Sequence, residues 1–201
     1  MTQAPVIPVV TIDRAGDAVP LARALVAGGL TVIEVTLRTP AALQAVRAIR
    51  TQVDSCIVGV GTVTRAGDIA AAIAAGAQYL VSPGTTPDLA AALAETSVPV
   101  IPGCATVSEA MGLADRGFGT LKFFPAAAAG GADWLKAVAA PLPHVKFCPT
   151  GGIDAHNAPA YLALPNVVAV GGSWPAAPDL VRSGDFARIT ALARDASALR
   201  R

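Results

Sequence analysis

The chain has 201 residues, of which 53% are hydrophobic and 14% charged, and its formal net charge is +1. This composition argues against intrinsic disorder, which needs low hydrophobicity and high net charge, and against nucleic-acid binding, which needs a clustered basic surface. Apolar runs are cut by glycine, proline or a charge before the roughly 20 residues that a membrane span needs, and the amino terminus lacks a signal-peptide pattern. We therefore expect a cytoplasmic protein with no membrane or nucleic-acid partner.

Cysteine and histidine are scarce in this chain. Cys56, Cys104 and Cys148 form no CxxC motif and lie in or beside apolar runs, so we expect reduced, buried thiols. Only His144 and His156 are present, which makes a histidine-rich metal site hard to assemble.

Short runs rich in β-branched residues recur along the chain and are typical of buried strands. Eight such runs are candidate strands: Ile7–Thr11, Thr31–Thr36, Cys56–Thr62, Gln78–Ser82, Val98–Pro102, Thr120–Phe124, Val145–Cys148 and Val167–Val170.

Alanine- and leucine-rich segments with helix signals lie between these runs. Asp17 can cap the start of the first helix, Pro20 suits its first turn, and Gly28-Gly29 follows its end. Similar start signals open later segments, at Thr39-Pro40, at Thr86-Pro87-Asp88 and at the Thr-x-x-Glu capping box of Thr106–Glu109.

Strands that alternate with helices predict parallel βαβ units. Eight such units favour a closed (β/α)8 TIM barrel, an α/β fold, formed as one domain over residues 1–201. The alternative is an open, doubly wound sheet, which usually carries a G-x-G-x-x-G turn after its first strand. Here the first strand runs into Asp13-Arg14 instead.

The second strand carries a carboxylate on its inner face. Side chains alternate along a strand, so the apolar set of Ile33 and Val35 should face the helices and Glu34 the barrel interior. Burying a carboxylate is unfavourable unless it is paired, and Arg38 follows on the same face at the strand's end. Active sites of these barrels lie at the carboxyl ends of the strands, so a functional role is favoured over an interior salt bridge.

The sixth strand points Lys122 into the barrel by the same alternation. Burial disfavours a charged ammonium, and a neutral amine can attack a carbonyl. Lys136 belongs to a helical segment, and Lys146 is the competing strand lysine. Lys146 begins its strand and should lie nearer the bottom of the barrel, which favours Lys122 only modestly.

Glycine-rich turns follow the last two predicted strands, at 150–152 and at 171–173. Loops after the seventh and eighth strands often bind phosphate in TIM barrels, because glycines let backbone N–H groups approach an anion. A tight turn with no ligand is the simpler alternative.

These residues lie in segments whose order and sequence are similar to a known family. Nearly the whole chain resembles the 2-keto-3-deoxy-6-phosphogluconate (KDPG) aldolases, which also cleave 4-hydroxy-2-oxoglutarate. The matching segments are Val32–Thr39, Val58–Val63, Ser82–Gly84, Ile101–Gly103, Thr106–Glu109, Leu121–Ala126, Phe147–Ile153 and Gly171–Trp174.

The resemblance implies a class I aldolase that works through a Schiff base. Lys122 matches the Schiff-base lysine, Glu34 the general acid/base, and Arg38 the arginine that holds the substrate carboxylate. The resemblance also implies that the enzyme needs no metal or other cofactor, binds a small-molecule substrate and forms a homotrimer. The remaining matches are Thr62, Pro83 and Thr150 at the pyruvate end, and Gly151, Gly152, Gly172 and Ser173 at the phosphate site.

The chain departs from the family's usual pattern at a few positions outside the lysine and Glu34. Ala127 and Ala129 replace a frequent Glu and Asn, Thr85 replaces Leu, and Cys104-Ala105 replaces Ile-Ser. These departures leave the preference for the distal part of the substrate open.

Three other functions fit parts of the pattern. A sister aldolase for the galactonate epimer would use the same residues. A phosphosugar isomerase on the same barrel would use an acid/base pair with the phosphate loops. A non-catalytic phosphate-binding subunit would gain little from an inward lysine and glutamate.

Overall fold

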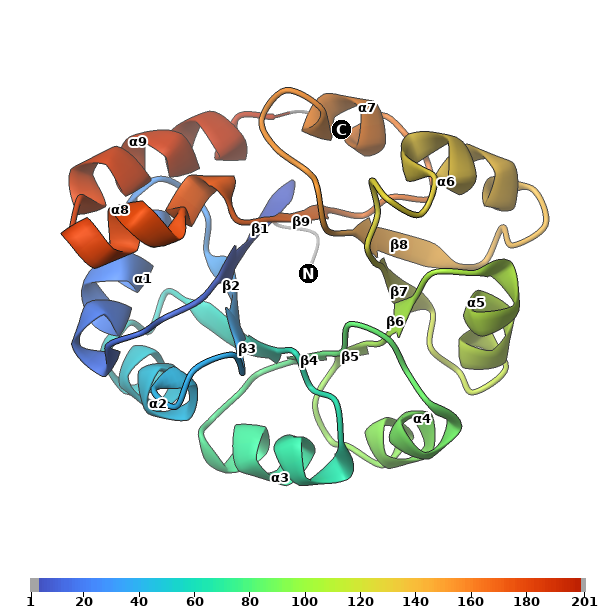
Figure 1. Ribbon diagram of the computed structural model, residues 1–201, viewed down its shortest axis with the longest axis horizontal. Coiled ribbons are helices and arrows are strands. Elements are labelled where there is room, and N and C mark those ends of the chain that lie inside the picture. The colour runs from blue at the N-terminus through green and yellow to red at the C-terminus, as the bar shows by residue number, and fades with distance from the viewer. Residues whose placement is uncertain (1–3, 200–201) are drawn as a thin grey trace.

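Parallel strands form the inner wall of a closed barrel, and helices surround it (Figure 1). The computed structural model describes residues 4–199. The strands are β1 (Val6–Val10), β2 (Val32–Thr36), β3 (Ile57–Gly61), β4 (Leu80–Val81), β5 (Val100–Ile101), β6 (Gly103–Cys104), β7 (Thr120–Phe123), β8 (Lys146–Pro149) and β9 (Val170–Gly172).

The helices form the outer layer, and two short 3-10 helices lie at the rim. They are η1 (Ala15–Asp17), α1 (Ala18–Ala27), α2 (Ala42–Gln52), α3 (Ala66–Ala74), α4 (Pro87–Ala94), α5 (Val107–Ala114), α6 (Gly131–Ala139), α7 (Ala158–Leu162), η2 (Trp174–Ala176), α8 (Pro178–Ser183) and α9 (Phe186–Ser197).

The barrel closes through two sheets and the bridges between them. One sheet has the strand order β5-β4-β3-β2-β1-β9 and the other the order β6-β7-β8. An isolated parallel bridge between Thr150 and Gly171 joins the β8 edge to β9. The other gap is a break in one strand, because β6 begins directly after Pro102, where β5 has ended. The predicted (β/α)8 TIM barrel is confirmed, and the open sheet is excluded.

Two strand predictions need correction. The fifth predicted strand is divided at Pro102, which has no N–H for a ladder hydrogen bond. The eighth begins at Val170 instead of Val167, because Val167 makes only an isolated bridge with Phe147. Gly171 and Gly172 therefore belong to β9 itself, rather than to the turn after it.

Most of the predicted helix signals are confirmed. The capping box of Thr106 and Glu109 is present at the start of α5, and Thr86 accepts a hydrogen bond from the backbone N–H of Leu89 in α4. The prediction for Asp17 was wrong: its carboxylate makes no cap hydrogen bond and instead accepts from the guanidinium of Arg14. That exposed ion pair competes with the cap for the same carboxylate.

Side-chain alternation divides the apolar residues into two cores. Ile33 and Val35 belong to the large core between strands and helices, while Val32 belongs to a small cluster inside the barrel. Tyr79 and Cys148 lie in the same inner cluster. The inner wall therefore has an apolar layer toward the amino ends of the strands.

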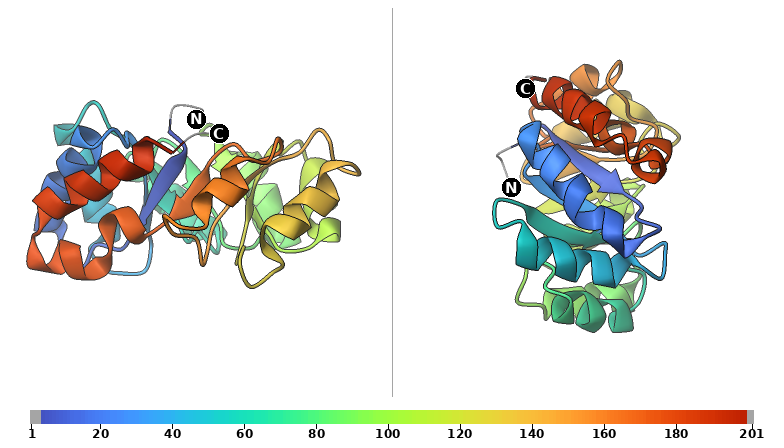
Figure 2. Two further views of the ribbon diagram at one scale, coloured as in Figure 1. Left: turned by 90° about the horizontal axis from the view of Figure 1, so that it is seen from above. Right: turned by 90° about the vertical axis from the view of Figure 1, so that its left-hand side faces the viewer.

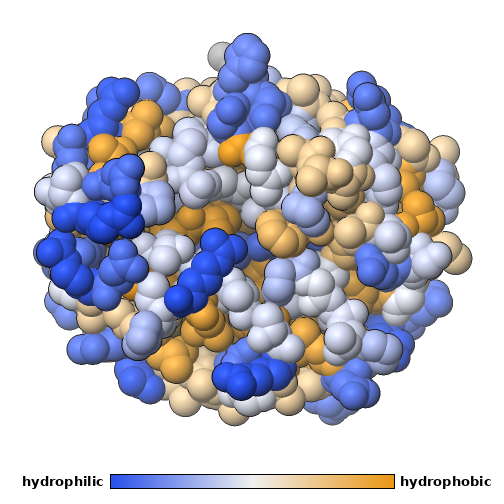
Figure 3. Space-filling model, in the orientation of Figure 1, coloured by the Kyte–Doolittle hydropathy of each residue, from blue (hydrophilic) through white to orange (hydrophobic). Residues whose placement is uncertain are grey.

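The views of Figure 2 show the helices packed on the outside of the barrel from both directions. In Figure 3, many of the strongly hydrophilic residues lie toward the outer rim, and several hydrophobic residues lie nearer the middle. In residues 4–199, the helices are all too short or too polar to span a membrane.

The inner face of β3 is built from glycine, and this yields a stability prediction. A Cβ on Gly59 would overlap the buried ring of Tyr79, whereas a Cβ on the exposed Gly67 of α3 would meet no atom within 4 Å. We expect Gly59→Ala to lower the free energy of unfolding by about 1–3 kcal/mol through overpacking. Gly67→Ala should raise it by roughly 0.5–1 kcal/mol through helix propensity. Urea unfolding of both variants measures this, and a Gly59→Ala protein as stable as the wild type would contradict it.

Candidate active site

A buried lysine and a buried glutamate meet inside the barrel. Nζ of Lys122 on β7 donates a hydrogen bond to Oε1 of Glu34 on β2 at 3.0 Å, and each residue is only 4% exposed. Both side chains point inward, as the alternation of their strands predicts. The barrel thus joins two groups that lie 88 residues apart in the chain.

Glycine provides the space for this pair. A Cβ on Gly61, at the end of β3, would overlap the carboxylate of Glu34. Glu34 therefore lies against bare backbone in the barrel wall. Any side chain at position 61 would displace the carboxylate from Lys122.

An aromatic ring connects the pair to the barrel mouth. Nζ of Lys122 lies 5.5 Å from the centroid of the Phe124 ring, a cation–π distance. A Cβ on Gly151 would lie 3.2 Å from Cδ2 and Cε2 of the same ring. Phe124 thus lies close to both the lysine and the loop after β8.

A cavity of about 360 Å³ opens beside Phe124 at the carboxyl ends of the strands. Six of the residues selected from the sequence line it together: Arg38, Thr150, Gly151, Gly152, Gly172 and Ser173. In the described chain its lining carries the Arg38 guanidinium and no carboxylate. This charge and the glycine backbone make the cavity suited to an anion.

The shape of the loop after β8 is set by its backbone conformation and backbone hydrogen bonds. Gly151 and Gly152 have positive φ angles of 99° and 72°, a region that glycine favours. The N–H groups of Ala126 and Ala127 donate to the carbonyl oxygens of Thr150 and Gly151 at 2.8 and 3.0 Å. Ala127, at which this chain departs from the family pattern, therefore contacts the glycine loop through its backbone N–H.

The departure at Thr85 also has a structural role. Its hydroxyl donates to the carbonyl oxygen of Gly103 at 2.9 Å and lies 2.9 Å from the hydroxyl of Ser82. Gly103 is paired in register with Lys122. Thr85 therefore ties the loop after β4 to the strand beside the lysine.

The lining of the 360 Å³ cavity includes neither Lys122 nor Glu34, and it also lacks two of the selected substrate-binding residues, Thr62 and Pro83. Thr62 directly follows β3 and has a φ of 63°, which is uncommon for a β-branched residue. The backbone of Pro83 lies against Gly103, the register partner of Lys122. Thr62 thus follows the strand next to that of Glu34, and Pro83 contacts the strand next to that of Lys122.

Thr11 and Phe124 line the cavity as well, and neither was predicted from the sequence as a site residue. Thr11 follows β1, and its hydroxyl lies 3.1 Å from that of Thr36. The alternation of side chains along β1 and its place at the strand's carboxyl end were the signals that could have identified Thr11.

Lys146 does not share this site. It begins β8, and its Nζ donates to the carbonyl oxygen of Pro165 at 3.2 Å. The lysine beside Glu34 is therefore Lys122.

The three cysteines are free and buried, and burial raises the pKa of the Cys56 thiol to about 12. Among residues 4–199, no three His, Cys, Asp or Glu side chains converge as a metal-ligand set.

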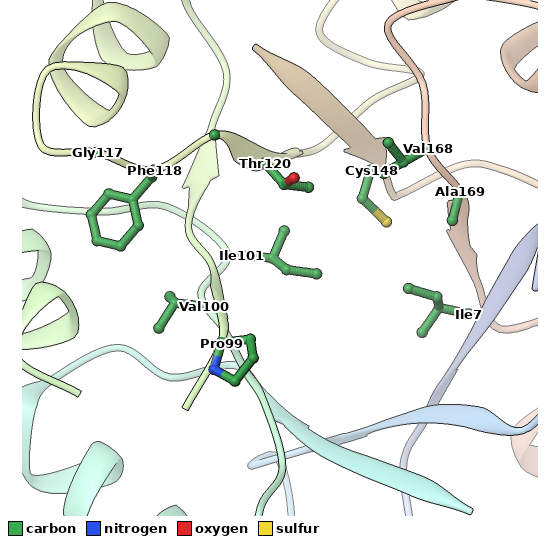
Figure 4. Close-up of a pocket in the computed structure, with 11 residues that line it drawn as sticks. Ile7, Pro99, Val100, Ile101, Gly117, Phe118, Thr120, Cys148, Val168 and Ala169 are labelled. Atoms are coloured by element: carbon green, nitrogen blue, oxygen red, sulfur yellow. The ribbon is translucent and has the colours of Figure 1, made fainter. Parts of the chain in front are cut away.

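Another cavity, of about 570 Å³, lies at the amino ends of the strands. Ile7, Ile101 and Cys148 point into it in Figure 4, and its lining is mostly apolar. It contains no acid/base pair in the described chain. The arrangement suited to chemistry is at the carboxyl end, where an amine and a carboxylate can exchange a proton next to an anion pocket.

Known proteins share this sequence and this barrel. A 2-dehydro-3-deoxy-phosphogluconate aldolase of Dickeya dadantii is 51% identical, over 98% of this chain and 93% of that protein. The KDPG aldolase of Legionella pneumophila, solved with pyruvate captured as a covalent carbinolamine, has a TM-score of 0.96 and 46% identity, over 98% of this chain and 96% of that one.

A third relative was solved with a phosphorylated ligand. The 2-keto-3-deoxy-6-phosphogluconate aldolase of Zymomonas mobilis with 3-phosphoglycerate has a TM-score of 0.93 and 46% identity, over 100% of this chain and 94% of that one. The family described as "KDPG and KHG aldolase" matches residues 1–192. The chain therefore belongs to the KDPG and KHG aldolase family.

Proposed function

We propose that this protein is a class I aldolase that cleaves KDPG to pyruvate and glyceraldehyde 3-phosphate, and that it also cleaves 4-hydroxy-2-oxoglutarate to pyruvate and glyoxylate. The observation that carries the proposal is the buried contact of 3.0 Å between Lys122 and Glu34, near a cavity whose lining of Arg38 and glycine backbone suits an anion. Membership of the family supports it. The pyruvate carbinolamine of the Legionella relative supports the covalent route.

Lys122 acts first, as the nucleophile. Glu34 accepts a proton from the ammonium across their hydrogen bond, and the neutral amine attacks the C2 ketone of the substrate. The resulting carbinolamine loses water when Glu34 returns the proton to its hydroxyl. An iminium ion then links Lys122 to C2.

Carbon–carbon cleavage follows from this iminium ion. Glu34, again as the carboxylate, takes the proton of the C4 hydroxyl, directly or through a water. The C3–C4 bond breaks, C4 becomes the aldehyde carbon of glyceraldehyde 3-phosphate, and the bonding electrons form an enamine. Protonation at C3 and hydrolysis of the imine release pyruvate and restore the amine.

The other residues hold the two ends of the substrate. Arg38 supplies two parallel N–H donors for the carboxylate, and Thr62, Pro83 and Thr150 border the pyruvate part. The phosphate end is assigned to the glycine loops of the cavity. This assignment is supported by the positive φ angles of Gly151 and Gly152 and by the cavity lining that these two residues share with Gly172 and Ser173.

The Schiff base gives the first test. Incubation with pyruvate followed by borohydride should leave the mass of reduced pyruvate on the peptide that carries Lys122, measured by peptide mass spectrometry. Lys122→Arg should abolish both trapping and turnover, because a guanidinium cannot form the imine. Lys146→Arg is the matched control and should still be trapped. An active enzyme without an adduct at Lys122 would contradict the mechanism.

Glu34→Gln tests the acid/base role. We expect kcat for KDPG to fall by about 10²–10⁴-fold, the usual contribution of general acid/base catalysis. Some imine should still form, because the nucleophile is kept, so borohydride trapping at long incubation should remain detectable. A variant with wild-type kcat would remove Glu34 from the mechanism.

Ser173→Ala tests the phosphate end of the cavity. Losing one hydroxyl donor to a charged phosphate should raise KM for KDPG by about tenfold, the equivalent of about 1.4 kcal/mol. The KM for 4-hydroxy-2-oxoglutarate should not change, since this substrate has no phosphate. Steady-state assays with both substrates measure the difference, and equal effects on both would contradict the assignment.

The Lys122→Arg variant and a comparison of substrates distinguish two rival functions. A phosphosugar isomerase would keep activity in Lys122→Arg, because it needs no Schiff base. A sister aldolase for the galactonate epimer would prefer that epimer when KDPG and its epimer are compared at equal concentration. The buried lysine–glutamate contact favours an aldolase over the isomerase.

We also propose a homotrimer that works in the cytoplasm. The trimer is an expectation from the family resemblance. Free, buried Cys56, Cys104 and Cys148 support a reducing compartment.

A further inference from the structure

Tyr79 is a fully buried tyrosine whose hydroxyl has no hydrogen-bond partner among residues 4–199. It directly precedes β4, and its ring belongs to the cluster inside the barrel, together with Ile7, Ile101 and Cys148. Buried hydroxyls in native proteins nearly always have a partner, which can be an ordered water. The hydroxyl of Tyr79 therefore needs an explanation.

The ring lies directly below the lysine–glutamate pair. A Cβ on Gly59 would overlap Cζ of Tyr79, the atom that bears the hydroxyl. Gly59 is the register partner of Glu34 on β2. Two residues farther along β3, Gly61 leaves the space that the Glu34 carboxylate fills. The phenol and the carboxylate thus occupy successive layers over the same glycine strand.

Burial and the neighbouring charge keep the phenol protonated, so that it can donate a hydrogen bond. Burial first, and then the charge of Glu34, raise the pKa of Tyr79 well above its usual value. The other titratable groups facing this layer are Lys122 on β7, Cys148 on β8 and Cys56 before β3. Burial raises the pKa of both thiols to about 12, so they stay neutral. The Glu34 carboxylate is therefore the group to which the phenol in this layer can donate a hydrogen bond.

A cavity adjoins the cluster that contains Tyr79. This cavity of about 570 Å³ at the amino ends of the strands is lined by Ile7, Ile101 and Cys148, which are members of that cluster (Figure 4). Its volume is many times that of one water molecule.

We propose that Tyr79 is a positioning residue: its hydroxyl, through one buried water, donates to the Glu34 carboxylate from below and holds it against Lys122. The water enters from the amino-terminal cavity, away from the substrate. Tyr79 touches neither substrate nor reacting atoms and acts through Glu34. The proposal rests on the proposed aldolase function, which supplies its assay.

Tyr79→Phe tests it through the pH profile of kcat/KM for KDPG. A hydrogen bond to a carboxylate favours the charged form, so its loss lets the carboxylate take up a proton at higher pH. Because the charged form is the base, we expect the acid limb of the profile to move upward by about one pH unit. Tyr161→Phe is the matched control, since Tyr161 on α7 is also buried but lies in the outer core. Its profile should coincide with that of the wild type.

The outcomes separate this proposal from the proposed function. An upward shift of at least about half a pH unit in Tyr79→Phe alone supports the positioning role. A smaller shift overturns it, and a higher Tm in the same variant would then identify a hydroxyl that truly lacks a partner. A wild-type protein without aldolase activity would refute the proposed function, whereas an active one with an unmoved Tyr79→Phe profile refutes only the role of Tyr79.

Discussion

Two opposite charges in the interior of a barrel must satisfy one another, because little water reaches them. Taking a carboxylate and an ammonium out of water costs several kcal/mol per ion, even after relaxation. Lys122 and Glu34 offset this cost through their hydrogen bond of 3.0 Å, and Phe124 adds a ring face toward the lysine. Removing either charge would leave the other buried and unpaired.

The barrel divides its interior into layers with different tasks. Toward the amino ends of the strands, Ile7, Val32 and Ala169 belong to an apolar cluster that supports the wall. Toward the carboxyl ends, the wall carries Glu34 and Lys122, and the glycine loops follow. Parallel strands make this division possible, because all their carboxyl ends meet at one mouth. Chemistry is thus confined to the end at which loops can vary without disturbing the core.

Alternation and spacing were enough to predict the barrel and the inward direction of Glu34 and Lys122. They could not separate Lys122 from Lys146, since both follow a β-branched or apolar residue and precede phenylalanine. The difference is depth: Lys146 begins β8 and bonds to the carbonyl oxygen of Pro165. Strand ends also escaped prediction where pairing, rather than composition, sets the limit, as at Val167. Thr11 was missed because its direction in the strand and its place at the strand's carboxyl end are weak signals for a single hydroxyl.

The role of β3 was the hardest to predict, because its glycines contribute the space that side chains would otherwise fill. Gly59 and Gly61 are two residues apart and share the inward face, so the wall is bare backbone at both levels. Tyr79 fills the lower space and Glu34 the upper one. A side chain at either level would overlap the residue that fills it. The space for the carboxylate therefore depends on a residue without a side chain, just as the space for the aromatic ring beneath it does.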